Sequence, residues 1–170
     1  VFDAKEVYPL ESSVVLAKQL ANRWPEAKLV LLGMALSNGP RVSINTAFAH
    51  DPERIEDHVQ KTNVAQLMDI IATLDVLIVG NTGPAHLAGA LDVPQVCLFL
   101  SEAPSVTRWA PFSAKARIIK RVPRCEIICR PAACPQALTV CEVDIPPAQI
   151  VAAVAEALAL QYQGWRQRTD

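Results

Sequence analysis

This 170-residue chain lacks several features that would place it at once in a protein class. Its apolar runs are too short to cross a bilayer, because stretches such as Val76–Val79 and Val96–Leu100 have only the length of a strand. The opening residues, VFDAKEVYPLESS, lack the basic and then apolar regions of a signal peptide. We therefore expect no transmembrane segment and no secretory leader.

The chain also lacks an excess of either positive or negative charge. The formal net charge is −1, so no strong electrostatic field would select nucleic acid as a partner. Hydrophobic residues make up 51% of the chain and charged residues 19%, a balance typical of globular proteins. The length suffices for one domain with a core of its own. Because the chain starts at Val1 and the first recognisable element is a helix, we expect it to be truncated at its N-terminus.

Both common nucleotide-binding fingerprints are absent. The sequence contains no G-x-G-x-x-G and no G-x-x-x-x-G-K-[ST], which excludes an ordinary dinucleotide site and a P-loop.

The order of the elements nevertheless predicts a nucleotide-binding type of fold. Short apolar segments at Leu29–Leu32, Val76–Val79 and Val96–Leu100 alternate with helical patterns. Such strands favour a parallel sheet with helices on both faces, in which these three are neighbours. We predict one doubly wound, mainly parallel, Rossmann-like α/β domain over residues 1–170. Short strands are expected at Ile55–Val59 and Ala116–Lys120, helices at 14–24, 64–74, 84–91 and from Pro147, and irregular structure at 34–54. Ser12 or Ser13 is expected to cap the first of these helices, and Asn63, with Gln66 as its capping-box partner, the second.

The turn VGNTGPAH, residues 79–86, is the strongest functional signal. Ligands of doubly wound sheets bind at the carboxyl ends of strands, and this turn follows one. Gly83 permits a close approach or a positive φ, and Pro84 suits the first position of a helix. The amides of Ala85 and His86 are then expected to be free, which with the helix dipole makes an anion site. The alternative that this turn and its histidine serve only the fold, and bind no ligand, stays open. Gly-Pro helix starts are common, and a histidine near a helix end is often structural.

Five cysteines add a second question. Cys97 lies in an apolar strand and is expected to be a buried small hydrophobe. The remaining four lie in a loop at 122–146 and are Cys125, Cys129, Cys134 and Cys141. We expect them to lie close in space, and zinc or iron binding, two disulfides and free thiols all remain open.

The segment VGNTGPAHLAGALDVPQVCLF resembles the signature of glycosyltransferase family 9, the heptosyltransferases of lipopolysaccharide synthesis. Further similar segments are KEVYPLESSVVLAKQL, LVLLG, QKTNVAQLMDIIATLD, TRWAP and the tail CEIICRPAACPQALTVCEVDIPPAQIV. The likeness covers nearly the whole chain.

The resemblance implies a GT-B fold of two Rossmann-like domains, of which this chain is the C-terminal, donor-binding one. The catalytic base would lie in the missing N-terminal domain. The whole enzyme would transfer a sugar with inversion from a nucleotide-sugar, ADP-heptose by default, to a lipopolysaccharide, another glycan or a lipid-linked acceptor. It would need no metal cofactor, would work in the cytoplasm or peripherally at the inner membrane, and this fragment alone would be inactive.

Carried over by position, the resemblance assigns donor binding to Lys5, Asn81, Thr82, Gly83 and His86. Lys5, Thr82, Gly83 and His86 would contact the diphosphate, whose departure they would assist electrostatically.

Two positions depart from the family pattern. Asn81 stands where heptosyltransferases often have aspartate, and no acidic residue follows Gly33, although Glu53 is a conceivable substitute for a ribose contact. The alternative function is a non-catalytic nucleotide- or partner-binding module derived from such an enzyme. A sugar-nucleotide epimerase is disfavoured by the TGPxHLA core and the cysteine tail.

Overall fold

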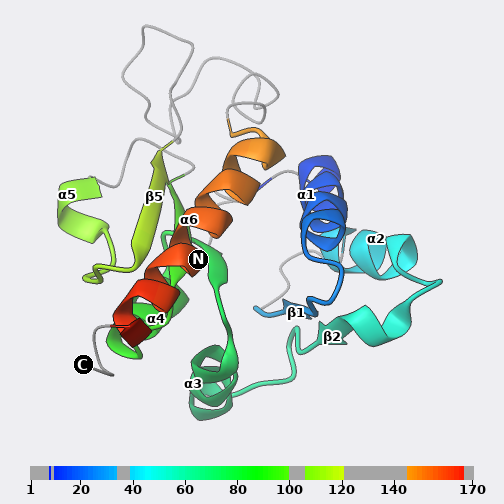
Figure 1. Ribbon diagram of the computed structural model, residues 1–170. Coiled ribbons are helices and arrows are strands. Elements are labelled where there is room, and N and C mark those ends of the chain that lie inside the picture. Colours follow the sequence, from blue (N-terminus) through cyan, green and yellow to red (C-terminus); the bar gives the residue numbers. More distant parts are fainter. Residues whose placement is uncertain (1–7, 9, 34–38, 100–105, 121–144, 167–170) are drawn as a thin grey trace, which may run out of the picture.

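The computed structural model describes residues 8, 10–33, 39–99, 106–120 and 145–166 (Figure 1). Its helices are α1 (Leu10–Arg23), α2 (Gly39–Ala47), α3 (Val64–Thr73), α4 (Gly83–Ala90), α5 (Val106–Trp109) and α6 (Pro147–Arg166), with a 3-10 turn η2 (Pro52–Arg54). Its strands are β1 (Leu29–Leu31), β2 (Ile55–Asp57), β3 (Leu77–Gly80), β4 (Gln95–Phe99) and β5 (Ala116–Lys120).

Every strand pair in the described part of the chain is parallel, as the alternation of apolar strands and helices predicts. Strand β3 pairs with β4, so that Leu77 lies opposite Gln95. Strand β4 pairs in turn with β5, so that Gln95 lies opposite Ala116. The α/β class and the pairing of the second and third predicted strands are therefore confirmed.

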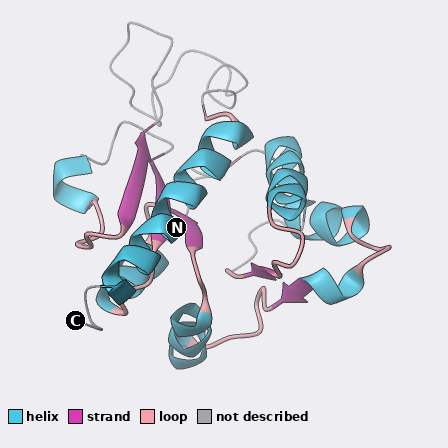
Figure 2. Ribbon diagram, viewed as in Figure 1, coloured by secondary structure: helices cyan, strands magenta, loops and turns pink. Residues whose placement is uncertain are grey.

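The first predicted strand does not join that sheet, so this part of the prediction is wrong. Strand β1 pairs instead with β2, with Leu29 opposite Ile55, and the two form a separate two-stranded sheet (Figure 2). Sequence patterns report that a strand is buried on both faces, but they do not report which strand lies beside it.

Helices cover both faces of the strands. On one face, α1 and α6 pack over β4 and β5 around Leu16, Val96, Leu98 and Ile150. On the opposite face, α3 and α4 supply Ile71 and Ala88, which pack around Leu77 of β3. Strand β4 is buried at all its residues, which explains its continuously apolar sequence.

Three local predictions can be compared with the helices. The helix α3 begins with the predicted capping box, in which the Asn63 side chain accepts from the Gln66 amide and the Gln66 side chain accepts from the Asn63 amide. Helix α1 begins at Leu10, so Ser12 and Ser13 lie inside it and do not cap it. Residues 39–47 form α2 and are not irregular, because Gly39 and Pro40 open a helix here just as Gly83 and Pro84 do in α4.

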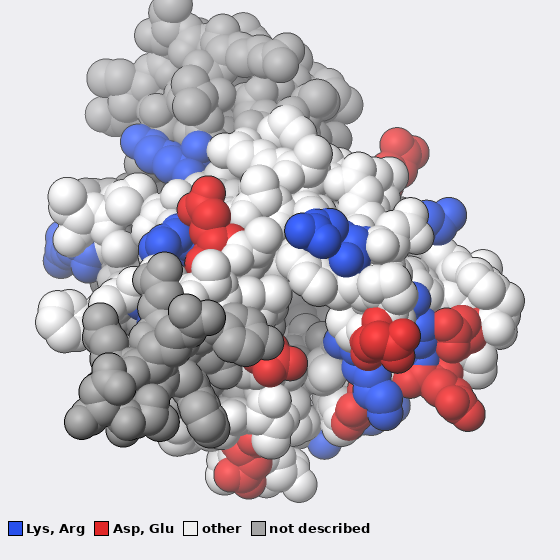
Figure 3. Space-filling model, in the orientation of Figure 1, with Lys and Arg blue, Asp and Glu red and all other residues white. Residues whose placement is uncertain are grey.

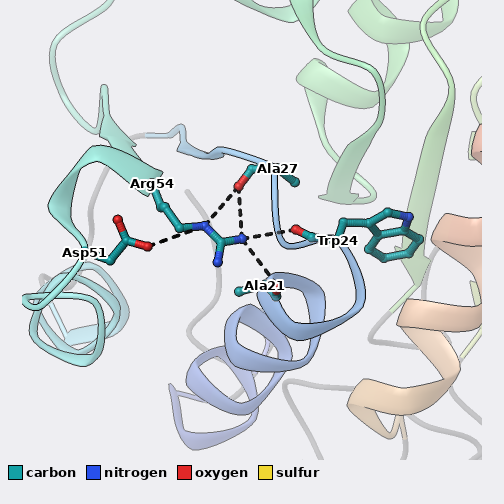
Figure 4. Close-up of polar contacts among 5 residues, drawn as sticks. All are labelled: Ala21, Trp24, Ala27, Asp51 and Arg54. Atoms are coloured by element: carbon teal, nitrogen blue, oxygen red, sulfur yellow. Dashed lines mark hydrogen bonds and ion pairs between the residues drawn. The ribbon is translucent and has the colours of Figure 1, made fainter.

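The carboxyl end of α1 is completed by an arginine from another segment. Arg54, in η2, donates hydrogen bonds to the carbonyl oxygens of Ala21, Trp24 and Ala27 at 3.1–3.3 Å, and Asp51 lies 3.9 Å from its Nε (Figure 4). The last carbonyls of a helix have no partners within the helix. Arg54 supplies such partners and connects α1 to the β1–β2 sheet.

Candidate functional site

The predicted anion-binding turn lies at the carboxyl end of β3, where β3 leads into α4 (Figure 1). The β3–β4 ladder continues one residue past the strand, because the Asn81 amide donates to the Leu98 carbonyl at 3.1 Å. This bond fixes the main chain at Asn81 against β4. The residues that follow, Thr82 and Gly83, are thus held at the ligand-binding edge of a parallel sheet.

Thr82 is the N-cap residue of α4, but its side chain does not cap the helix. Its hydroxyl instead donates to the Gly80 carbonyl at 3.4 Å, a long bond at the limit of hydrogen-bond geometry. A threonine at this position normally satisfies one of the first amides of a helix. Here the hydroxyl oxygen keeps its acceptor sites and the helix start keeps its positive character.

The amides of this first turn differ from the prediction in one respect. The Ala85 amide donates to the Thr82 carbonyl at 3.0 Å, so it is not free, and Pro84 has no N–H. The Gly83 amide has no partner within the described part of the chain. Of the predicted pair, the Ala85 amide is therefore not available to an anion, whereas the amide of the exposed Gly83 is.

Gly83 does not have a positive φ, so of the two properties that glycine permits, only a close approach remains relevant here. It is exposed, and a Cβ added to it would meet no atom within 4 Å. The surface beside this glycine is open, and a ligand can approach its main chain directly.

His86 lies on the outer side of α4. Its side chain is exposed, and it makes no hydrogen bond or ion pair within the described residues, whereas Ala85 and Ala88 of the same helix are fully buried. A structural histidine packed in the core is therefore excluded. The exposed imidazole lies within a turn of the Gly83 amide, and its ring N–H groups can donate to an anion bound there.

The inner side of the site is apolar. Cys97 of β4 is completely buried in a cluster with Ala85 and Phe99, as predicted. Burial raises the pKa of the Cys97 thiol to about 11, which keeps it neutral and unreactive. This packing anchors the first turn of α4 to the sheet.

Other predicted residues lie outside the described ranges. They are Lys5, the four clustered cysteines Cys125, Cys129, Cys134 and Cys141, and nearly all of the loop at 122–146. Among the residues that the structure does describe, no group of three His, Cys, Asp or Glu side chains is placed to hold a metal. The grouping of the cysteines and their ligand, if any, remain predictions.

A polar cluster at the carboxyl end of β2 was missed by sequence reasoning. The Asp57 carboxylate accepts from the Asn45 side chain at 3.1 Å and from the Val59 amide at 3.0 Å, and His58 lies 2.6 Å from Glu56. Glu53, the suggested ribose contact, precedes β2 and so lies at the opposite end of that strand. The polar run Glu56–His58 could have indicated this cluster. The sequence analysis instead includes these residues in a strand that ends at Val59, whereas β2 ends at Asp57.

Charges of both signs are mixed on the face shown in Figure 3. Several basic side chains are paired, such as Lys115 with Asp92 at 2.6 Å and Arg117 with Glu156 at 3.2 Å. None of the helices in the described ranges is both long and apolar enough to cross a membrane.

Comparison with known proteins identifies the family of this chain. A family model described as glycosyltransferase family 9 (heptosyltransferase) matches residues 17–138, well over half of the chain. The chain belongs to glycosyltransferase family 9. The match includes the whole β3–α4–β4 unit that carries Asn81, Thr82, Gly83 and His86.

One curated relative is lipopolysaccharide heptosyltransferase 2 of Salmonella typhimurium. It is 31% identical over 108 residues, which are 63% of this chain and 30% of that protein. The chain thus spans less than half the length of this relative.

Solved structures agree on the fold. The structure of the E. coli ADP-heptose lps heptosyltransferase II has a TM-score of 0.72 and 23% identity, and the likeness covers 93% of this chain and 44% of that one. The E. coli heptosyltransferase WaaC, solved with ADP, has a TM-score of 0.66 and 13% identity over 92% of this chain and 42% of that one. The parallel α/β fold is therefore that of one half of a GT-B heptosyltransferase.

Proposed function

We propose that this chain is the nucleotide-sugar-binding, C-terminal domain of an inverting heptosyltransferase-like enzyme. The whole enzyme would transfer a sugar, by default from ADP-heptose, to a lipopolysaccharide or another glycan acceptor. Support comes from the family membership and from the heptosyltransferase structure solved with ADP, which has the same fold. A second domain would hold the acceptor and the catalytic base.

The start of α4 is the observation that carries this proposal. The Gly83 amide, the open surface beside Gly83 and the exposed His86 ring all lie within the first turn of a helix that follows a parallel strand. A diphosphate bound there would accept hydrogen bonds from the amide, from the imidazole and from the Thr82 hydroxyl. Lys5 and Asn81 would complete the donor site.

The chemical role of this site would be to stabilise the leaving group. When the glycosidic bond to the diphosphate breaks, negative charge develops on the departing phosphate oxygen. Donors that are already oriented toward this oxygen lower the barrier without reorganisation. A metal ion is not required by this arrangement, because the helix start and Lys5 would supply the compensating positive charge and His86 would add a hydrogen bond.

The proposal is tested by replacing His86. We expect His86→Ala to weaken ADP binding about 10- to 150-fold, because a hydrogen bond to a charged phosphate contributes about 1.5–3 kcal/mol. Calorimetric titration of ADP into the wild-type and variant chains measures the change. The fold should stay intact, since the imidazole is exposed and unbonded within the described residues.

A matched control is His50→Ala. His50 is also exposed, but it lies between α2 and η2, away from the start of α4. It should leave ADP affinity unchanged. Equal losses in both variants, or no loss in either, would contradict a diphosphate site at α4.

The alternative of a non-catalytic module rests on Asn81, which keeps a hydrogen-bonding side chain but lacks the charge of the family's usual aspartate. ADP binding without any sugar transfer by the natural full-length protein would favour that alternative.

A further inference from the structure

We propose that the end of α5 and the turn after it form a contact site for an anionic membrane surface. Trp109 and Phe112 would enter the lipid interface, and the basic side chains around them would attract the lipid headgroups. The family resemblance allows a peripheral location at the membrane but gives no surface for it. This inference goes beyond the proposed function and does not depend on the nucleotide site.

The first argument is that two large aromatic side chains of this segment are exposed. Phe112 is fully exposed, and the exposed fraction of Trp109 is 47%. They are three residues apart, so their Cα atoms lie within about 11 Å of one another. Helix α5 packs inward through Val106 and Ala110 on the cluster around Phe99, so the core is filled without the two aromatic rings. Large apolar groups that are exposed side by side mark interaction surfaces.

The turn that presents Phe112 has an ordered main chain. The Ser113 amide donates to the carbonyl of the buried Pro111 at 3.0 Å. The Ser113 hydroxyl accepts from the Lys115 amide at 3.2 Å, and its carbonyl accepts from the Ala116 amide at 3.3 Å. The aromatic ring is therefore held outward by a preformed turn, which lowers the entropy cost of binding.

The charge of this segment suits an anionic surface. Residues 106–120 contain no acidic residue and four basic ones, which are Arg108, Lys115, Arg117 and Lys120. Acidic side chains from outside the segment pair with Lys115 and Arg117. Arg108 and Lys120 are exposed and have no acidic partner within the described residues. The charged side chains that Figure 3 shows over α5 are basic.

Basic and aromatic groups also occur together here. The Arg108 guanidinium carbon lies 5.4 Å from the centre of the Trp109 ring. Tryptophan is favoured at the boundary between headgroups and acyl chains, and arginine is attracted to anionic headgroups. A bilayer interface offers both environments at one depth.

The size and shape of the surface favour a bilayer over a protein partner. One exposed phenylalanine and one half-exposed tryptophan present roughly 300 Å². A stable protein interface buries about 800 Å² on each partner, so these two rings are too small to hold a second copy of the chain. Phe112 also projects from the surface. A protein would need a matching pocket for it, whereas fluid lipid adapts to a projecting side chain.

The turn lies away from the proposed nucleotide site. The Lys115 ammonium donates to the Asp92 carboxylate at 2.6 Å, and a Cβ added to Gly89 would lie 3.4 Å from the Phe112 carbonyl oxygen. Gly89 and Asp92 are at the end of α4, whereas Gly83 is at its start, about 12 Å away along the helix axis. A membrane that contacts Phe112 would therefore leave the start of α4 open to a ligand.

The test is co-sedimentation of the 170-residue chain with vesicles of equal parts phosphatidylglycerol and phosphatidylcholine. We expect binding to these vesicles, and binding at least about tenfold weaker to phosphatidylcholine alone, because the attraction to anionic headgroups is lost. Phe112→Ser should lower the partition coefficient at least about fivefold, because a small polar side chain replaces the inserted ring. Arg108→Gln should weaken binding to the anionic vesicles and leave binding to phosphatidylcholine unchanged.

Val64→Ser is the matched control. Val64 is also an exposed apolar residue, but it lies at the start of α3 and outside the turn. This variant should bind the anionic vesicles as the wild type does. Circular dichroism should show the same fold for Phe112→Ser, because the side chain that it removes is exposed.

Equal binding to both kinds of vesicle, or equal binding by the wild type and Phe112→Ser, would overturn the proposal. So would a loss in Val64→Ser as large as that in Phe112→Ser. If size-exclusion chromatography shows a dimer that Phe112→Ser abolishes, and no vesicles are bound, the turn contacts a second copy and the proposal is wrong. Phe112→Ser should leave ADP affinity unchanged, so failure of this proposal is distinguishable from failure of the nucleotide site.

Discussion

Arg54 shows how much one side chain can contribute at the scale of a residue. Its guanidinium bonds to three carbonyls at or just after the end of α1 and thereby connects η2 to that helix (Figure 4). Arginine suits this role because its planar group presents several donors in fixed directions. The free energy of unfolding should therefore depend on Arg54 although it is not part of an apolar core.

We expect Arg54→Ala to lower the free energy of unfolding by about 2–4 kcal/mol, since several charge-assisted bonds are lost and carbonyls are left unsatisfied. Arg54→Lys should recover only part of this, because one ammonium cannot reach all three carbonyls. Urea denaturation measures both. The neighbouring, exposed Glu53→Ala is the control and should cost less than about 0.5 kcal/mol; a loss as large as that of Arg54→Ala would contradict the assignment.

At the scale of an element, the start of a helix decides its role in this protein. Asn63 caps α3 through its side chain, accepting from the Gln66 amide at 2.9 Å, whereas Thr82 leaves the start of α4 uncapped. Helix α3 contributes the fully buried Ile71 to the core. Its capped end serves stability, and the uncapped end of α4 is available to a ligand.

Asn63→Ala should therefore lower the free energy of unfolding by about 1 kcal/mol, the usual loss for an N-cap. Asn63→Asp should cost nothing, because aspartate caps equally well and its charge suits the positive end of the helix. Thermal or urea unfolding monitored by circular dichroism compares the two. Equal destabilisation by both variants would show that the side-chain amide, and not the cap, is what α3 needs.

At the scale of the whole molecule, the chain corresponds to less than half of a heptosyltransferase. The likeness to the E. coli ADP-heptose lps heptosyltransferase II covers 44% of that chain. Under the proposed function, the donor and acceptor sites belong to different domains. Binding of the nucleotide and transfer of the sugar should then be separable.

We expect the purified 170-residue chain to bind ADP but to transfer no sugar from ADP-heptose to a lipopolysaccharide acceptor. The physical reason is that the proposed base and acceptor site lie in the other domain. A radiolabelled transfer assay measures this, with the natural full-length protein as the positive control. Turnover by the 170-residue chain above background would contradict the division of roles.

The sequence by itself determined the class of fold and most of the elements. Continuously apolar strands separated by helices predict parallel strands covered on both faces, and every strand pair among the described residues is parallel. The Asn63 cap and the β3–α4 turn could also be predicted, because each depends on residues within one turn of one another. The family resemblance rests on the same local pattern and is confirmed by the family match at residues 17–138.

Tertiary structure alone decided which strands are neighbours and which polar groups are satisfied. The pairing of β1 with β2, the bond from Ala85 to Thr82 and the exposed side of α4 on which His86 lies are not encoded in any short pattern. Strand pairing and burial depend on segments far apart in the chain, so their energies enter only once the elements pack.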